Sequence, residues 1–280
     1  MINKTLQLKL NNKLVDLSTP IVMGIINVTP DSFYKGSRIS SDKSILNATE
    51  KMLADGATIL DIGGYSTRPS ANPVSQDEEI TRISTALEII LKKFPDTKIS
   101  IDTFRSGVVR HSNSNFHVAM INDISGGTLD DLMFETIADT GLAYVLMHTR
   151  GNPQTMQSLT QYEDIVSEVI LYLEKKISQL HLLGVNDIIV DPGFGFAKTM
   201  EQNYILLRKL SYFKELNVPI LAGISRKSML YKLLDLQPEE SLNATTAANM
   251  LALIGGATIL RVHDVKEAMQ TISIFNQYNK

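Results

Sequence analysis

The sequence contains no cysteine and no excess of basic residues. Without cysteine, the 280-residue chain cannot form disulfides, a thiol nucleophile or a thiolate metal site. Its 27 Lys and Arg residues are balanced by 30 Asp and Glu residues, for a net charge of −3. That balance argues against a nucleic-acid partner, because nucleic acids bind to basic surfaces.

Long apolar runs are absent as well. No stretch has the length of a membrane-spanning helix, and the N-terminus lacks the apolar core of a signal peptide. We therefore expect a cytoplasmic protein with no membrane partner. The hydrophobic content of 44% is ordinary for a globular chain with a sizeable core.

Eight short apolar runs occur along the chain, and each ends near polar or glycine residues. Runs that are short, apolar on both faces and rich in β-branched residues are typical of buried parallel strands. They cover residues 21–27, 58–63, 98–102, 118–122, 143–148, 187–191, 219–223 and 258–263. Helix signals lie between them, and the expected helices cover residues 41–55, 77–94, 132–140, 162–183, 199–213, 242–254 and 263–278.

The alternation of strands and helices predicts the α/β class and a single (β/α)8 TIM barrel. Its eight units use nearly the whole chain, so we expect one domain over residues 1–280, with the barrel at 19–280. Residues 6–10 and 13–17 alternate in polarity on either side of Asn11 and Asn12, which predicts an N-terminal β-hairpin within residues 1–18. We expect this hairpin to cap the bottom of the barrel.

Polar side chains end several of the runs, and in a barrel these ends converge on one face. Asp102, Asn122 and Asp191 are such residues. Each has a structural alternative, because Asp often caps the next helix and Asn often lies in turns. Two carboxylates and an amide deep in an apolar barrel otherwise suit a planar ligand with several N–H donors.

Cations follow the last two strands. The run from Gly223 to Ser228 carries Arg226 and Lys227, although a lysine is usually a solvated surface residue. Arg261 lies inside the final apolar run, where it needs a partner, and His263 falls on the same side of that strand. Barrels often bind phosphate near these loops, so we predict a phosphorylated, flat heterocycle as ligand. His148 ends another strand and could simply satisfy a backbone group; no two histidines have zinc-ligand spacing.

The stretches that carry these residues resemble dihydropteroate synthases. They cover the barrel in that family's order and are together very specific. The matching residues are 23–33, 63–69, 100–103, 121–124, 146–148, 151–153, 191–196, 225–228 and 261–265. The resemblance implies a folate-synthesis enzyme that joins 4-aminobenzoate to 6-hydroxymethyl-dihydropterin diphosphate. Diphosphate is released with Mg²⁺ present, and sulfonamides are expected inhibitors.

The resemblance also implies roles for individual residues. The implied catalytic residues are Asp102, Lys227, Arg261 and Asn27, and Asn27 is the implied Mg²⁺ ligand. The implied pterin pocket comprises Asp102, Asn122, Asp191 and Lys227, with Met147 as an apolar wall and Gly223 in the substrate-binding set. Arg261 is expected to stack on the pterin, with His263 near the diphosphate; Thr67, Arg68, Pro69, Phe196 and Ser225 are expected around the aminobenzoate.

Two other functions fit part of the pattern. A pterin-dependent methyltransferase would share the pterin pocket but has no reason to keep the stretches at 29–33, 66–69 and 225–227. A non-catalytic pterin-binding paralogue would be expected to lose at least one of the implied catalytic residues, and none is lost. The helix expected near residues 243–254 has apolar or small residues on nearly every face, which either packing or a subunit interface explains. We expect a homodimer.

Overall fold

Eight parallel strands form the centre of the molecule. The structure is a computed structural model that describes residues 6–28, 38–65 and 74–280, with side chains omitted for 38–41. The sheet has the strand order β8-β7-β6-β5-β4-β3-β10-β9. The strands are β3 (Ile21–Asn27), β4 (Ile59–Gly63), β5 (Ile99–Asp102), β6 (Met120–Asp123), β7 (Ala143–Met147), β8 (Ile188–Asp191), β9 (Leu221–Ala222) and β10 (Ile259–Val262). One parallel bridge, between Val190 of β8 and Ile220 directly before β9, closes the sheet into a barrel.

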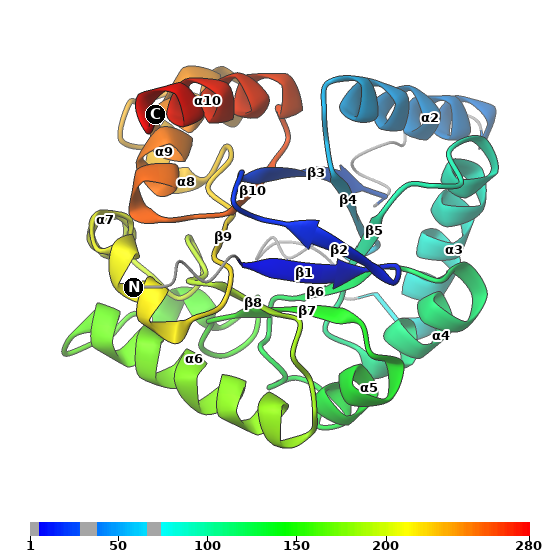
Figure 1. Ribbon diagram of the computed structural model, residues 1–280, viewed down its shortest axis with the longest axis horizontal. Helices are drawn as coiled ribbons and strands as arrows, with labels where there is room; N and C mark the ends of the chain where they lie inside the picture. The colour runs from blue at the N-terminus through cyan, green and yellow to red at the C-terminus, as the bar shows by residue number, and fades with distance from the viewer. Residues whose placement is uncertain (1–5, 29–37, 66–73) are drawn as a thin grey trace.

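Helices surround the barrel and cover its outer face (Figure 1). They are α2 (Arg38–Ala54), α3 (Gln76–Lys93), α4 (Ser106–Phe116), α5 (Met133–Thr140), α6 (Ile165–Leu182), α7 (Met200–Arg208), α8 (Ser228–Tyr231), α9 (Leu242–Gly255) and α10 (Val265–Tyr278), with 3-10 turns at η1 (Met156–Ser158), η2 (Leu210–Leu216) and η3 (Pro238–Glu240). The larger core lies between the strands and this ring of helices. Within the described ranges, no helix has the length and apolarity needed to cross a bilayer.

The N-terminal hairpin lies across one mouth of the barrel. Its strands are β1 (Gln7–Leu10) and β2 (Lys13–Asp16), and Figure 1 shows them crossing the centre of the ring. Leu8 and Leu10 are buried against apolar residues from the lower ends of the barrel strands, among them Ile59 and Ile189. The Lys9 amide also donates to Asp187 Oδ1 at 2.8 Å, just before β8. The hairpin therefore seals the bottom and leaves the carboxyl ends of the strands for chemistry.

The observed fold confirms the predicted class, barrel and capping hairpin, but some details differ from the prediction. Helix α4 and the short helix α8 were not predicted. The helix expected over 199–213 ends as an α-helix at Arg208 and continues as the 3-10 turn η2. Strand β9 has only two residues where five were expected.

Candidate active site

At the carboxyl ends of the strands, polar residues that are far apart in the sequence lie at a similar height in the barrel. Strand register pairs Asn27 with Gly63, Gly63 with Asp102, and Asp102 with Asn122. On the other side of the barrel, Met147 pairs with Asp191. Side chains alternate across a strand, so these positions share the inner face while their neighbours pack against the helices. A pocket forms there, lined by Asp102, Asn122, Ile124, Met147, Asp191, Phe196, Gly223, Lys227 and Arg261.

A buried ion-pair network fixes Arg261 in this pocket. Its Nε donates to Asp61 Oδ2 at 2.6 Å, and its Nη2 donates to Asp102 Oδ2 at 2.6 Å. The amide of Asn122 donates to the same Asp61 oxygen at 2.9 Å. Burial alone would lower the pKa of Arg261, but the two carboxylates outweigh it and raise that pKa. The guanidinium therefore stays charged and keeps one orientation.

Asp191 and Lys227 are two further charged groups that line the pocket. Burial raises the pKa of Asp191, and the nearby Lys227 charge and the Gly193 N–H partly offset that rise. Burial lowers the pKa of Lys227 to about 8, against the opposing effect of Asp191. The Lys227 ammonium donates to the Phe194 carbonyl and lies 4.7 Å from the centre of the Phe196 ring. The pocket thus offers both a strong acceptor and a donor side by side.

Neither Asp102 nor Asp191 caps a helix in the structure. The N-cap residue of α4 is Arg105, which makes no side-chain capping bond, while Asp102 accepts from Arg261. Asp191 Oδ1 accepts from the Gly193 N–H at 2.7 Å inside a turn. Burial raises the pKa of Asp102 and the Arg261 charge lowers it in part, so its protonation responds to what binds nearby. Both carboxylates face the pocket.

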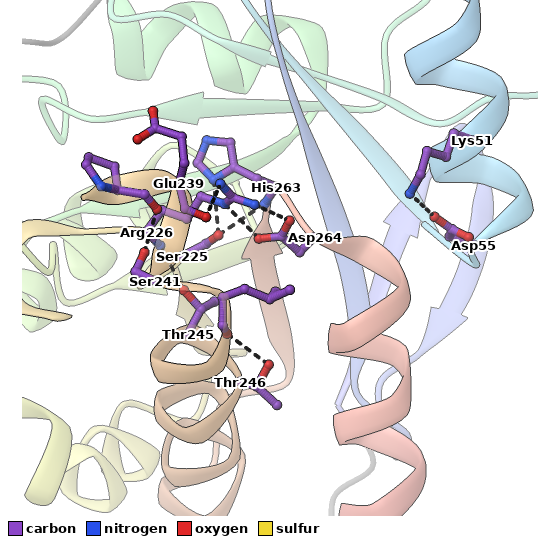
Figure 2. A network of polar contacts seen from close by, with 12 residues as sticks. Lys51, Asp55, Ser225, Arg226, Glu239, Ser241, Thr245, Thr246, His263 and Asp264 are labelled. Atoms are coloured by element: carbon purple, nitrogen blue, oxygen red, sulfur yellow. Dashed lines mark hydrogen bonds and ion pairs between the residues drawn. The ribbon is translucent and has the colours of Figure 1, made fainter. Parts of the chain in front are cut away.

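Ser225 and His263 lie beside the pocket, while Arg226 turns away from it. Ser225 Oγ is 3.0 Å from His263 Nδ1 and accepts from the His263 N–H at 3.2 Å (Figure 2). Arg226 has a φ of +55° and forms two bonds to Asp264, Nε to Oδ2 at 2.9 Å and Nη2 to Oδ1 at 2.7 Å. Arg226 therefore links the loops that follow β9 and β10, and it is not a second pocket cation as its place beside Lys227 suggested.

Comparison with known proteins gives a consistent result. The family model "Pterin binding enzyme" matches residues 23–263. Dihydropteroate synthase of Escherichia coli strain K12 is 42% identical over 262 residues, which cover 93% of this chain and 92% of that protein. The Synechocystis enzyme of the same name is 44% identical over 254 residues, or 90% of this chain and 87% of that one. This chain belongs to the dihydropteroate synthase family.

Solved structures of dihydropteroate synthases have the same fold. The Xanthomonas albilineans enzyme with 4-aminobenzoic acid superposes with a TM-score of 0.90 at 33% identity, covering 99% of each chain. The Yersinia pestis enzyme with a sulfonamide drug has a TM-score of 0.89 at 37% identity, covering 98% of this chain and 99% of that one. These relatives support a folate-synthesis transferase over the methyltransferase and the non-catalytic paralogue.

The predicted site residues of this family member divide into three groups. Eight line the one pocket described above: Asp102, Asn122, Met147, Asp191, Phe196, Gly223, Lys227 and Arg261. Three lie close by: Ser225 and His263 contact each other and follow the lining residues Gly223 and Arg261 by two positions, and Asn27 lies next to Gly63. Thr67, Arg68 and Pro69 fall outside the described residues. The roles of all of them stay predictions.

Sequence reasoning missed Asp61. This residue is fully buried in the middle of β4 and accepts hydrogen bonds from two pocket residues, Arg261 and Asn122. A signal was present, because a carboxylate inside an apolar strand needs a partner. Asp61 also precedes Gly63 by two residues, which places both on the inner face. Asp61 lies in the middle of its strand, whereas the prediction considered only polar residues at strand ends.

Proposed function

We propose that the pocket binds the pterin ring of a dihydropterin diphosphate, which the enzyme joins to 4-aminobenzoate with release of diphosphate. The observation that carries this proposal is the convergence of acceptors and cations in one apolar enclosure. Asn122 and Asp191 present amide and carboxylate groups that match an amino-pyrimidinone edge. The 4-aminobenzoic acid bound to the Xanthomonas relative supports the choice of second substrate.

In the proposed reaction the methylene C–O bond of the pterin substrate breaks, the diphosphate leaves, and the arylamine nitrogen attacks that carbon. Asp102 lies where a carboxylate would favour positive charge on the pterin, and Arg261 and His263 would offset the charge of the diphosphate. The amine loses its proton after attack, so no strong protein base is needed. Positioning and electrostatics then supply most of the rate enhancement.

Asn27 fits the proposed Mg²⁺. A Cβ placed on Gly63 would lie 3.4 Å from Asn27 Oδ1 and 3.6 Å from Asp102 Cβ, so the amide oxygen stands beside the pocket. Within the described residues, no three His, Asp or Glu side chains gather as a metal site. One amide oxygen suits Mg²⁺ that arrives with phosphate oxygens, because Mg²⁺ commonly takes few protein ligands there. The bound ion would offset the negative charge of the leaving diphosphate.

Phe196 lines the pocket, and Ser225 follows its lining residue Gly223 by two positions; both are proposed to contact the aminobenzoate. Thr67, Arg68 and Pro69 keep their proposed roles in that site, on the strength of the family resemblance. The sulfonamide bound to the Yersinia relative supports the proposal that such drugs compete for this position. A cytoplasmic location and a single domain over residues 1–280 also remain proposals.

The test is a turnover assay with both substrates and Mg²⁺ that follows diphosphate release and the joined product together. Wild-type protein should release one diphosphate for each product molecule. Asp191→Ala should weaken pterin diphosphate binding by about 2 to 4 kcal/mol, because the ring's paired donors lose their acceptor. Asp139→Ala, an exposed position on α5, is the control. Undiminished affinity in folded Asp191→Ala would refute the pocket assignment.

We propose further that the enzyme is a homodimer formed through α9 and α10. These helices pack side by side (Figure 1) and carry the exposed apolar residues Leu251, Ile254, Ile274 and Tyr278. An apolar surface of this kind favours a second copy as its cover.

Analytical ultracentrifugation should find a dimer for wild-type protein and a monomer for Ile254→Glu. The control is Leu182→Glu on α6, a residue that is 88% exposed and should leave the dimer intact. A monomeric wild-type protein would contradict the proposal.

A further inference from the structure

Lys198 is a buried lysine whose hydrogen bonds, within the described part of the chain, go to backbone carbonyls and a histidine instead of a carboxylate. Its side chain is only 5% exposed. Its Nζ lies 3.0 Å from the Gly193 carbonyl, 2.9 Å from the Phe196 carbonyl and 3.4 Å from the His148 carbonyl. It also lies 3.0 Å from His148 Nδ1. Burying an amine is costly unless its donors are used, and here each N–H has an acceptor.

These acceptors belong to the turn that follows β8 and to the end of β7. The turn is unusual, because Gly193, Gly195 and Ala197 all have positive φ values, of 73°, 82° and 50°. For alanine this conformation is unfavourable. The turn also lies tightly against β7, since a Cβ on Gly193 would come within 2.0 Å of the His148 carbonyl oxygen. Contacts from outside the turn are therefore needed to hold it in this shape.

The same turn shapes the pocket at three points. The Gly193 N–H orients Asp191, the Phe194 carbonyl accepts from Lys227, and the Phe196 ring forms a wall beside the Lys227 ammonium. A shift of the turn would move all three together. The shape of the turn therefore sets the geometry of the proposed pterin site.

His148, directly after β7, gives Lys198 a rigid partner. Its ring packs edge-on against Tyr172, with 4.9 Å between ring centres, and also contacts Tyr162. Burial lowers the pKa of His148 to about 2, and the nearby charge of Lys198 adds to this effect. The imidazole is therefore neutral, and with its proton on Nε2 it accepts from Lys198 through Nδ1.

We propose that Lys198 is a positioning residue for the synthase reaction. It fixes the turn at residues 193–196 to the end of β7, and so sets where Phe196 and Lys227 stand in the pocket. It acts through these residues and does not touch the substrate. The inference rests on the proposed function, because its readout is the use of pterin diphosphate.

The absence of cysteine from the chain permits a chemical test of this role. In Lys198→Cys, the single thiol can be alkylated in denaturant with 2-bromoethylamine, which rebuilds a lysine analogue after refolding. Alkylation with 1-bromopropane gives a side chain of similar length that has no N–H donor. Lys175→Cys, at an exposed position of α6, is the matched control for cysteine, reagents and refolding.

We expect Lys198→Cys and its propyl form to lose at least about tenfold in kcat/KM for pterin diphosphate. The aminoethyl form should recover to within about threefold of wild type carried through the same steps. Wild-type kcat/KM in the cysteine variant, or equal recovery with the propyl group, would overturn the inference. Ile90→Ala, a core variant of α3, separates general destabilisation from positioning, because it should lower stability and leave kcat/KM unchanged.

A second pair of variants leaves Lys198 in place in case Lys198→Cys does not refold. In His148→Asn, the amide oxygen is an acceptor three bonds from Cα, the same separation as Nδ1 of histidine. His148→Leu has no acceptor there. His148→Leu should lose more of the kcat/KM for pterin diphosphate than His148→Asn, and equal values would overturn the inference. Failure of the proposed function is distinguishable, because wild-type protein would then release no diphosphate at all.

Discussion

Arg261 and Lys227 are the cations that line the described pocket, and burial affects their protonation differently. Asp61 and Asp102 hold Arg261 in its charged form. Lys227 has the weaker support of Asp191, and its pKa falls to about 8. The first cation is therefore fixed across the usual pH range, while the second can lose its proton under mildly alkaline conditions.

This difference predicts an alkaline limb in the pH profile. Lysine is charged below its pKa, so kcat/KM for pterin diphosphate should fall as the pH rises through about 8. In Lys227→Arg the limb should disappear, because arginine keeps its proton, although the rate should stay below wild type since the forked guanidinium differs from a point charge. The measurement is kcat/KM from about pH 6 to about pH 10. An identical limb in both proteins would assign it to another group.

Asp61 gives a test of the buried network. Asp61→Asn keeps an oxygen for Arg261 and removes the negative charge, so a buried cation loses one of its two carboxylate partners. We expect a loss of about 2 to 4 kcal/mol in the free energy of unfolding, measured by urea denaturation. Asp139→Asn, which is exposed on α5, should change stability by less than about 0.5 kcal/mol. Equal stability of the two variants would show that the ion pair contributes little.

Strand-end residues were predictable because a polar residue directly after an apolar run has few structural explanations in a barrel. Asp61 and Lys198 were not predicted, for a shared reason. Their importance depends on partners such as Arg261 and His148 that are far away in sequence. Arg226 shows the opposite error, since its φ of +55° and its bonds to Asp264 separate it from Lys227 next to it.

At the scale of elements, the hairpin contributes stability at the mouth opposite the pocket. Leu10 is fully buried beneath the barrel strands, whereas Leu14 of the same hairpin is 71% exposed. Leu10→Ala should lower the free energy of unfolding by about 2 to 5 kcal/mol, and Leu14→Ala by less than about 0.5 kcal/mol. Chemical denaturation measures both. The kcat of Leu10→Ala should match wild type at low temperature, and a large loss would mean that the hairpin also shapes the pocket.

The elements that were predicted well have strong local signals. Helix α3 is capped by Ser75, has three acidic residues in its first turn and presents a buried apolar face. Helix α4 has the sequence SGVVRHSNSNF, with no acid in its first turn and no side-chain cap, so packing of Val108 and Val109 decides its conformation. Strand β9 is shortened by its place at the closing edge of the sheet, which no local pattern reports.

At the scale of the whole molecule, regular alternation was enough to predict the barrel, because each strand needs a helix to cover its outer face. The way in which the edge strands close the barrel was not predictable from this alternation. Which strands meet, and through how many pairs, depends on the twist and tilt of all eight strands together. The resulting barrel pairs β3 with β4 over five residues, but β8 meets the β9 segment at one bridge.

Because only one bridge closes the barrel there, the junction between β8 and β9 should open more readily than the other strand pairs. The Val190 amide, bonded to the Pro219 carbonyl at 2.9 Å, should exchange its hydrogen for deuterium faster than the amides between β3 and β4. Asp191 lies on one side of this junction and Lys227 on the other, so a pterin bound to both would span it. Deuterium uptake at residues 188–191 should therefore slow when pterin diphosphate binds, while uptake at residues 59–63 stays the same. If pterin diphosphate slowed uptake equally in both segments, it would stabilise the whole barrel and not the junction between β8 and β9 in particular.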